Sequence, residues 1–460
     1  MDRSLARSAP GYPIVVVGGG AAGILAAWRA ASRGAPVLLL EKNHRLGMKI
    51  LISGGGKCNV THEGEMNEIR SQFRSNEARF LKPSFYRFTN HDVIELLERR
   101  GIRLYSRPDG RIFPVDGTAR DVVAALEAHL RAAGVSIRLG AAVSGIEFRE
   151  IGPGAIRESQ KPTDELHPAK EVAAVLLGTE RIPTHHLILC VGGSSYPGTG
   201  TTGDGWPWVQ AAGHSLVKIR AALAPLFLET PQPFSESQIP NWAGVALRDC
   251  MLRARQSGKV FASWRGDLLF THRGVSGPCA LGISREVAER RSAGPVTLEV
   301  DLAPSSPIEA IIAGLHQWLR QNPRRPTGAF VDSLVPARLA PAFLESAGCE
   351  PGLLAAYLPQ KTRSRLAQQI KAWPIGSVQH VPLEKGEVVA GGVALDEVDP
   401  RTMRSRRAAG LYLCGEILDI AGPVGGYNLQ AAWSTGCVAG ESAAQDWMAR
   451  AYNASSRRNA

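Results

Sequence analysis

The pattern of hydrophobic residues predicts a strand, a helix and a second strand in the first forty residues. The apolar run Ile14 to Val17 leads directly into the glycine turn Gly18-Gly-Gly20-Ala-Ala-Gly23. A helical stretch follows to about Ser32, and a second apolar strand runs from Val37 to Leu40. These elements form a βαβ unit. The apolar stretch 14–31 is broken by four glycines and has Trp28-Arg29 near its end, which indicates a buried strand and helix and not a membrane span.

The glycine turn has the spacing of a dinucleotide-binding fingerprint. Gly18 permits the tight turn, Gly20 lets the backbone approach a pyrophosphate, and Gly23 lets the helix pack close to the strand. The helix N-terminus then faces the phosphates. Glu41 lies about twenty residues further on, where a carboxylate can bind both hydroxyls of an adenosine ribose. A glycine turn alone is sometimes only a turn, but the strands, the helix and the acid together predict dinucleotide binding.

Periodicity extends this α/β pattern to about residue 216. We expect helices over 92–100 and 121–133, and strands over 103–105, 111–113, 135–139, 142–148 and 186–191. The polar segment 152–170 contains prolines and is expected to be a loop between hairpin strands.

The character of the chain changes at about residue 217. Short strands alternate with Pro and Gly turns to about 301, helical spacing dominates 307–373, and strands return at 388 before a last helix over 428–449 and a frayed end at 455–460. We therefore expect a Rossmann-like nucleotide-binding domain over 10–216, completed by 385–450. An insert over 217–384 interrupts it, β-rich over 217–303 and helical over 304–376.

Composition adds bounds on the class of protein. A chain of 460 residues is too long for one simple core. Its seven cysteines are scattered without a CxxC pair, and Met1 to Pro10 lacks an apolar signal segment, so we expect a reducing cytoplasm and neither disulfides nor zinc. The net charge is +11, and 217–384 alone holds 19 Lys and Arg against 13 Asp and Glu, a difference of +6. This surplus is typical either of a solvated basic surface or of a polyanionic partner.

Three further segments point to a cofactor. The three glycines Gly54 to Gly56, expected after an apolar strand, free backbone N–H groups to face an anion or a ring, unless the segment is only a flexible loop. A strand ending in Gly415-Glu416 is followed by the turn Gly425-Gly426 and a helix. The N-terminus of this helix would stabilise an anion formed on a reduced isoalloxazine, unless the glycines and Asn428 merely cap the helix. A third strand ends at Gly192-Gly193.

Together these segments resemble a known family, the bacterial YhiN/BaiN-type flavoproteins, a branch of the two-dinucleotide-binding-domain FAD proteins. The resemblance spans nearly the whole chain. Its marks are Ile52-Ser-Gly-Gly-Gly-Lys-Cys-Asn-Val-Thr61, Gly110-Arg-Ile-Phe-Pro114, Gly193-Ser-Ser-Tyr-Pro197 with Thr202-Gly-Asp-Gly205, Leu269-Phe-Thr-His272 with Gly274-Val-Ser-Gly-Pro278, and the run Gly415 to Gln430. Lys57 departs from the arginine usual in the family, which keeps the charge but loses a bidentate contact.

The resemblance implies an extended FAD and a β-barrel-like plus helical insert that covers the open flavin face. The residues expected to bind FAD are Gly18, Gly20, Ala22, Gly23, Glu41, Lys42, Lys49, Ser53, Gly54, Gly55, Gly56, Asn59, Val143, Gly192, Gly415, Glu416, Gly425, Gly426, Tyr427, Asn428 and Leu429. Because no second GxGxxG unit is expected, NAD(P)H would bind transiently at the flavin as hydride donor.

Cys58 is the first candidate for a catalytic proton donor, although a free cysteine is more often a small buried hydrophobe. Asn59 would orient a carbonyl, and Tyr196, Tyr427 and His272 are rival acids. Cys190, Cys414 and Cys437 lie in apolar runs and are expected in the core, and Asp419 is expected to support the Gly425 turn.

Three hypotheses for function follow. The family is linked to dihydrouridine formation in large-subunit ribosomal RNA, and also to reduction of steroid enones and oxidation of small amines such as aminoacetone. The favoured hypothesis is an FAD-dependent, NAD(P)H-driven reductase of a C=C bond in a uridine of ribosomal RNA, with the basic insert as support. The second is a small-molecule oxidase or reductase. The third is a flavin-bearing RNA-binding protein without turnover.

Overall fold

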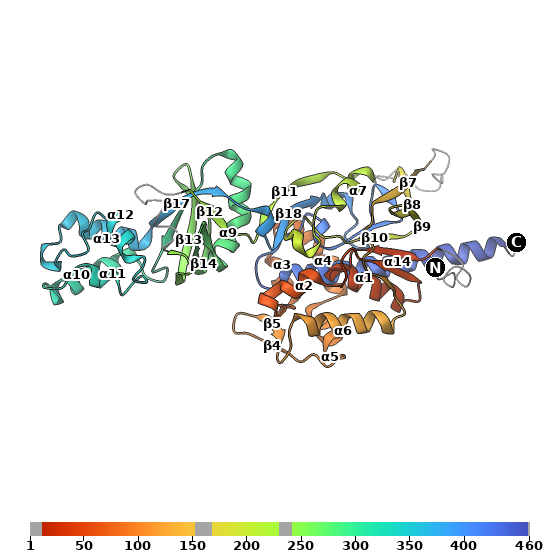
Figure 1. Ribbon diagram of the computed structural model, residues 1–460, viewed down its shortest axis with the longest axis horizontal. Helices are drawn as coiled ribbons and strands as arrows, with labels where there is room; N and C mark the ends of the chain where they lie inside the picture. The colour runs from red at the N-terminus through yellow and green to blue at the C-terminus, as the bar shows by residue number, and fades with distance from the viewer. Residues whose placement is uncertain (1–11, 152–167, 230–241, 459–460) are drawn as a thin grey trace. The chain divides into compact units, whose positions relative to one another are not determined.

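The computed structural model describes residues 12–151, 168–229 and 242–458 (Figure 1). The chain divides into two compact units, the first made of Met1–Ile219 with Val388–Ala460 and the second of Arg220–Glu387. The polar segment 152–170, expected as a loop, lies mostly outside the described residues.

A five-stranded sheet with every neighbouring pair parallel forms the centre of the first unit. The strand order is β20-β10-β1-β2-β6. The strands are β1 (Ile14–Val17), β2 (Val37–Leu40), β6 (Ser136–Arg138), β10 (Leu187–Leu189) and β20 (Leu411–Leu413). The side chains of β1, β2, β10 and β20 are nearly all buried, as parallel strands covered on both faces require, whereas the edge strand β6 has no fully buried residue. The expected α/β Rossmann-type fold is therefore confirmed.

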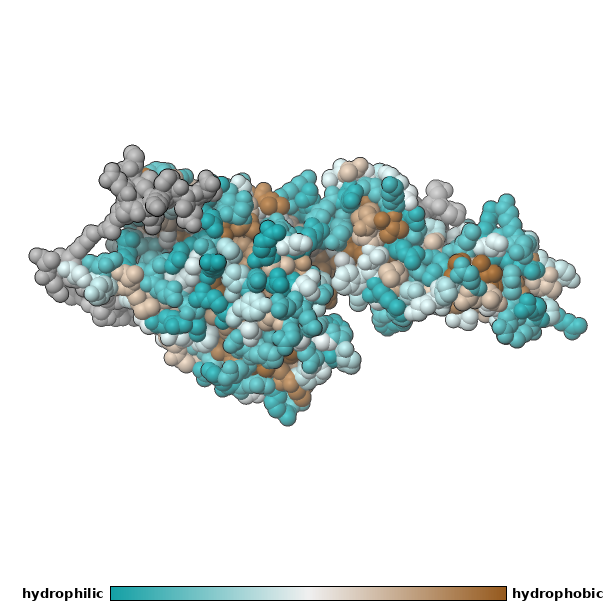
Figure 2. Space-filling model, turned by 180° about the vertical axis from the view of Figure 1, so that it is seen from behind, coloured by the Kyte–Doolittle hydropathy of each residue, from teal (hydrophilic) through white to brown (hydrophobic). Residues whose placement is uncertain are grey.

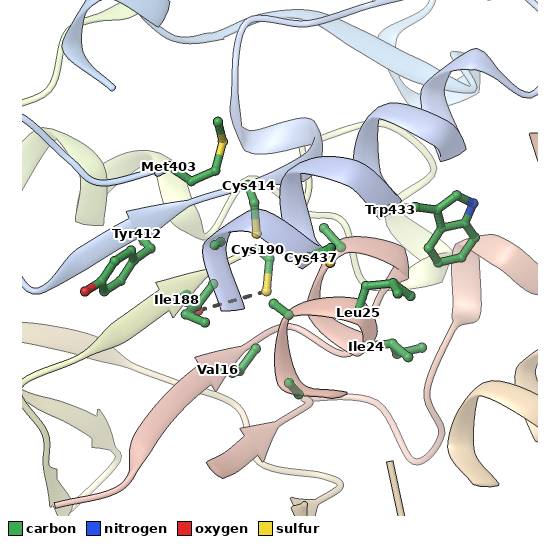
Figure 3. Close-up of a cluster of buried hydrophobic side chains, with 14 of the residues drawn as sticks. Val16, Ile24, Leu25, Ile188, Cys190, Met403, Tyr412, Cys414, Trp433 and Cys437 are labelled. Atoms are coloured by element: carbon green, nitrogen blue, oxygen red, sulfur yellow. Dashed lines mark hydrogen bonds between the residues drawn. The ribbon is translucent and has the colours of Figure 1, made fainter. Parts of the chain in front are cut away.

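Two helices distant in sequence pack directly against each other beside this sheet. These are α1 (Ala21–Ser32) and the last helix α14 (Tyr427–Arg458) (Figure 1). A Cβ placed on Gly436 or on Gly440 would lie 2.2 Å from the carbonyl oxygen of Ala22 or of Ala26, respectively. Two glycines one helical turn apart thus let the two backbones approach. Figure 3 shows Ile24 and Leu25 of α1 and Trp433 of α14 in the buried cluster formed with the strands.

The remaining elements of the first unit surround the sheet. Most expected elements occur at nearby positions: α5 (Asn90–Glu98), β4 (Leu104–Ser106), β5 (Arg111–Pro114), α6 (Ala119–Ala132) and β7 (Gly145–Glu150). Strands β11 (Leu216–Ala222) and β18 (Val388–Val393) lie where short strands were expected from about 217 and again at 388. The structure adds α2 (Met48–Ile52), the 3-10 turn η2 (Ser53–Gly56), β3 (Thr61–His62), α3 (Met66–Ser71), α4 (Ser75–Arg87), β8 (Lys170–Leu177), β9 (Glu180–Pro183), η3 (Pro197–Thr199), α7 (Gly205–Ala211), η7 (Leu395–Glu397), β19 (Ala408–Ala409) and η8 (Gly415–Ile417).

Two expectations about local structure are wrong. The strand expected before the three glycines is the short helix α2, which begins after Gly47 in the left-handed conformation (φ 67°) and buries Ile50 while leaving Ile52 exposed. The expected frayed end at 455–460 is instead helical as far as Arg458, because α14 continues past the predicted limit of 449.

The second unit contains a closed barrel and a helical part. The barrel has the order β12-β15-β14-β13-β16-β17, and its strands are β12 (Leu226–Leu228), β13 (Ala246–Gln256), β14 (Lys259–Thr271), β15 (Gly274–Ser276), β16 (Thr297–Asp301) and β17 (Trp373–His380). A helix that the sequence analysis missed, α9 (Gly277–Arg290), packs on β14. The helical part holds α10 (Ile308–Gln321), α11 (Gly328–Val331), α12 (Ala340–Ser346), η5 (Ala355–Tyr357) and α13 (Gln360–Lys371).

None of the helices over 12–151, 168–229 and 242–458 combines the length and the apolar character needed to cross a bilayer.

Candidate active site

Three glycine turns meet at one edge of the parallel sheet. Gly18 follows β1, Gly192 follows the end of β10, and Gly415 follows the end of β20, and each has a positive φ, between 72° and 105°. Neighbouring parallel strands end on the same side, so the three turns share the carboxyl edge, where α/β sheets bind their ligands. Two of the turns touch α1 or the adjacent strand. A Cβ on Gly415 would lie 2.8 Å from the Ala22 Cβ, and one on Gly18 would lie 2.5 Å from the Cys190 carbonyl oxygen.

The glycine turn between β1 and α1 packs against protein atoms at Gly23 and faces open space at Gly20. A Cβ on Gly23 would lie 1.8 Å from the Gly18 carbonyl oxygen, so the first turn of α1 packs tightly against the end of β1. Gly20, at the N-cap of α1, has no atom within 4 Å of its Cβ position. This leaves the N-terminus of a twelve-residue helix accessible to a phosphate group.

Glu41 is a buried carboxylate that backbone and side-chain donors hold in place. Its Oε2 accepts a hydrogen bond of 2.6 Å from the Gly19 amide, and its Oε1 accepts bonds of 2.8 Å and 2.7 Å from the amide and the Nδ2 of Asn43. The segment that leads toward Val143 is joined to the same place, since the Ala141 amide donates to the Glu41 carbonyl oxygen at 2.9 Å. Glu41 is thus fixed beside the glycine turn, as a ribose-binding acid must be.

An ion pair connects two of the predicted cofactor residues across the sheet edge. The Lys49 Nζ lies 2.8 Å from the Glu416 Oε2 and donates to the Ser195 hydroxyl at 2.9 Å. The amide of Val389 donates to the Glu416 Oε1 at 2.9 Å. The structure therefore brings Lys49 and Glu416 together with Gly192, whose Cβ position lies 3.6 Å from the Glu416 Oε2.

Lys42 takes part in a second polar group at this edge. Its Nζ donates to the Thr202 hydroxyl at 2.6 Å and pairs with Asp204 at 2.5 Å. The GxGxxG spacing does recur just before these residues, at Gly198-Thr-Gly200-Thr-Thr-Gly203, which corrects the expectation of a single such pattern. This second copy begins inside the 3-10 turn η3 and does not directly follow a strand, so it is not part of a βαβ unit.

The loop 53–59 and the start of α14 are joined through Asn59. In the orientation that satisfies both ends of its amide, the Asn59 oxygen accepts from the Gly426 amide at 2.9 Å and its nitrogen donates to the Thr61 carbonyl oxygen at 3.1 Å. Gly54 and Gly55 have left-handed backbones, with φ of 56° and 68°. Asn59 therefore holds two glycine turns side by side, and its predicted role toward a substrate carbonyl stays a prediction.

The other residues at the start of α14 form a compact turn. The Tyr427 ring stacks on the His62 ring with centroids 4.8 Å apart, and the Asn428 Oδ1 accepts from the Gly422 amide at 2.8 Å. Leu429 is partly buried against the core. Asp419 does not support the Gly425 turn as expected, because its Oδ1 accepts from the Gly391 amide at 2.9 Å.

The candidate proton donors lie in different environments. Cys58 is fully buried with a left-handed backbone (φ 62°), and burial raises the pKa of its thiol to about 12, although a hydrogen bond with Ser53 lowers it. Burial also raises the pKa of Tyr427. Tyr196 is 38% exposed in the first unit, and His272 is an exposed residue of the second unit. The choice among these acids stays a prediction, while Cys190, Cys414 and Cys437 are buried in the core as expected (Figure 3).

The sequence analysis missed residues that support this site. Asn43 orients Glu41, Ser195 binds Lys49, and Gly436 and Gly440 bring α14 onto α1. The last two carry a sequence signal, since small residues four apart on a helix permit close helix packing. Asn43 and Ser195 have no such signal, because their partners depend on the tertiary fold.

The site fits FAD through two independent observations: the open space beside Gly20 at the N-terminus of α1, and the Glu41 carboxylate fixed next to it. Fold and site define an FAD-dependent oxidoreductase with a Rossmann-type cofactor domain. The chain belongs to the family described as HI0933-like protein Rossmann domain, whose model matches residues 12–442. The resemblance to the YhiN/BaiN-type flavoproteins that the sequence motifs indicated is therefore confirmed.

Three relatives align with nearly the whole chain. The first, a 3-dehydro-bile acid delta(4,6)-reductase of Clostridium scindens, is 31% identical over 94% of this chain and 99% of the relative. Two proteins named ribosomal RNA dihydrouridine synthase, from Haemophilus influenzae and Escherichia coli, are 28% and 29% identical, each over 92% of this chain and 96% of the relative. Among solved structures, a 3-ketosteroid delta1-dehydrogenase of Sterolibacterium denitrificans has a TM-score of 0.48 at 14% identity, over 95% of this chain and 99% of that one.

Proposed function

We propose that the protein is an NAD(P)H-driven, FAD-dependent reductase that saturates a C=C bond of a uridine in large-subunit ribosomal RNA, which forms dihydrouridine. The observation that carries this proposal is the similarity to two ribosomal RNA dihydrouridine synthases over 92% of the chain. The net charge of +6 in residues 217–384 supports a polyanionic substrate.

Saturation of a conjugated C=C bond requires a hydride, a proton and a fixed ring. FAD, when bound, supplies the hydride-transfer chemistry. The chain must bind the cofactor through Gly20 and Glu41 and must supply the proton. Cys58 and Tyr427 are candidates that keep their protons at neutral pH, because burial raises the pKa of each group.

NAD(P)H is proposed as the reductant that acts transiently at the same place. The described residues hold one βαβ unit with a glycine fingerprint, and that unit is assigned to FAD. A separate nucleotide domain for NAD(P)H is therefore not part of the proposal.

A reductase of small enones is the second candidate function. The observation that favours it is the 31% identity to a bile acid reductase over 94% of the chain. A uracil ring and a conjugated enone both present a C=C bond activated by a carbonyl group, so the same site chemistry would serve either substrate.

Mass spectrometry of nucleosides from ribosomal RNA separates the two candidates. We expect a deletion strain to lack dihydrouridine in its large-subunit RNA and to regain it with the wild-type gene but not with Glu41→Ala. If dihydrouridine persists in the deletion strain while the purified protein reduces a steroid enone with NAD(P)H, the second candidate replaces the first.

A further inference from the structure

Two segments of the second unit lie side by side and form what we call the 320/355 strip, defined as residues 320–326 and 355–365. The Ala355 amide donates to the Arg325 carbonyl oxygen at 2.9 Å, and the Ala356 amide donates to the Pro323 carbonyl oxygen at 3.1 Å. The 3-10 turn η5 is thus bound directly to the segment that follows α10. The N-terminal part of α13 continues the strip.

The strip carries positive charge without compensation. Its two segments contain six basic residues and no Asp or Glu. The acids of the helical part, at 309, 332, 345 and 350, lie outside it. The basic residues of the strip that are exposed are Arg320, Arg324, Arg325, Lys361 and Arg365. No ion pair involves any of these five side chains within the described part of the chain.

In the barrel of the same unit, two arginines form ion pairs with acids. Arg255 pairs with Glu299 at 3.0 Å, and Arg265 pairs with Asp249 at 2.7 Å. These two arginines of the barrel thus have acids beside them, whereas the two segments of the strip contain no acid. Figure 2 shows that polar residues cover most of the face in view, with hydrophobic residues in small separate groups.

An exposed aromatic ring belongs to the strip. Tyr357, the last residue of η5, is 73% exposed, and it precedes Lys361 by four positions. Alternation of basic groups and an exposed aromatic ring is the arrangement that binds single-stranded nucleic acid, because the cations hold phosphates while the ring stacks on a base. The bases of a duplex would not stack on this ring, since paired bases are already stacked on each other.

We propose that the 320/355 strip binds unpaired RNA, with a base stacked on Tyr357 and phosphates held by Arg324, Arg325 and Lys361. The identity of that RNA as ribosomal rests on the proposed function, whereas the binding chemistry does not. The strip would select a single-stranded loop or an unfolded stretch of the substrate.

The test measures binding of the full-length FAD-loaded protein to a fluorescein-labelled RNA of about 12 nucleotides without self-complementarity, a length within the usual site size. Fluorescence anisotropy should show that Tyr357→Ala weakens binding about fivefold to hundredfold, the scale of one lost base stack. Tyr357→Phe should bind within about twofold of wild type because it keeps the ring. Tyr452→Ala is the matched control, since Tyr452 is also 73% exposed but lies on α14.

Salt dependence tests the phosphate contacts separately. Arg324→Ala and Arg325→Ala should each reduce the slope of log affinity against log salt by about 0.7, the value for one phosphate of a single strand. FAD content and far-UV circular dichroism should remain those of wild type, because these side chains are exposed.

Several results would overturn the proposal. One is equal affinity of Tyr357→Ala and wild type for the single strand, and another is tighter binding of the complementary duplex that no Tyr357 variant alters. A third is undetectable binding of the RNA together with capture of an acidic peptide, which would assign the strip to a protein partner. If RNA binding does not depend on Tyr357 but the deletion strain lacks dihydrouridine, the proposed RNA binding by the strip is refuted and the proposed function is not. Intact binding with dihydrouridine unchanged in that strain refutes the proposed function alone.

Discussion

The contact between α1 and α14 provides a quantitative test of how the cofactor site is held. Replacing Gly436 by alanine would place a Cβ 2.2 Å from the Ala22 carbonyl oxygen. An ordinary carbon–oxygen contact is more than 3 Å long, so the two helices would have to separate by roughly 1 Å. Ala22 lies between Gly20 and Gly23, and this movement would therefore reach the phosphate-facing end of α1.

The expected cost can be worked out from competing effects. Overpacking of a close contact costs about 1–3 kcal/mol, while alanine in place of glycine within a helix gains about 0.8–1 kcal/mol. Because the added Cβ would clash with backbone atoms, the upper part of the overpacking range applies, about 2–3 kcal/mol, and the net destabilisation is about 1–2 kcal/mol. We expect FAD binding to weaken about tenfold, which corresponds to ~1.4 kcal/mol. The sign of the effect is opposite to that of a glycine-to-alanine change in an uncrowded helix.

Gly314→Ala is the matched control, because Gly314 lies within α10 and has no atom within 4 Å of its Cβ position. Urea unfolding followed by flavin fluorescence reports on the first unit, and titration with FAD gives the affinity. Gly436→Ala should lower both the unfolding midpoint and the affinity, whereas Gly314→Ala should leave the affinity unchanged and should not lower the midpoint. An unchanged midpoint and affinity for Gly436→Ala would refute the packing argument.

Three further results are expected. The purified protein should be yellow with about one FAD per chain, and Glu41→Ala should weaken FAD binding by ~2–4 kcal/mol in a fluorescence titration because it removes charge-assisted hydrogen bonds; colourless protein after FAD saturation would contradict the assignment. Cys58→Ser should keep FAD bound and reducible but slow substrate reduction about a hundredfold in stopped-flow assays, and wild-type turnover would move the acid to Tyr427 or His272. Burial lowers the pKa of His186 to about 4 in the folded chain, from its ordinary value of 6.5. As the pH falls from 6.5 to 4, the unfolded chain takes up a proton that the folded chain does not, so the free energy of unfolding should decrease by up to ~3 kcal/mol. In urea titrations, His186→Phe should show a smaller decrease over the same pH interval.

The parts of the fold that sequence reasoning predicted are those with a local pattern. The strand, glycine turn and helix from Ile14 to Ser32 combine apolar periodicity with residues that have few other uses, and the structure has them at these positions. Helix α9 lies within the stretch where only short strands and Pro and Gly turns were expected, and it begins at Gly277-Pro278, since proline near the first position of a helix is common. The apolar run 50–52 is too short to distinguish a helix from a strand by periodicity.

In the candidate site, too, sequence reasoning predicted the residues that belong to a local pattern and missed the contacts between distant segments. The glycines and Glu41 were found from spacing along the chain, because one βαβ unit holds them within thirty residues. The pairing of Lys49 with Glu416 joins positions 367 residues apart and depends on the order of strands in the sheet. No local pattern specifies that contact, and the same is true of Asn59 and Gly426.

The order of strands also has a consequence for how the protein is made. β20, which pairs with β10, and α14, which packs on α1, leave the ribosome only after the whole of the second unit. The early segment with the glycine fingerprint must therefore wait, with one edge of its sheet and one face of α1 uncovered, until about residue 440 has been synthesised. FAD binding would then report that synthesis has passed this point, and ribosome-bound chains halted within 220–387 should bind the flavin poorly.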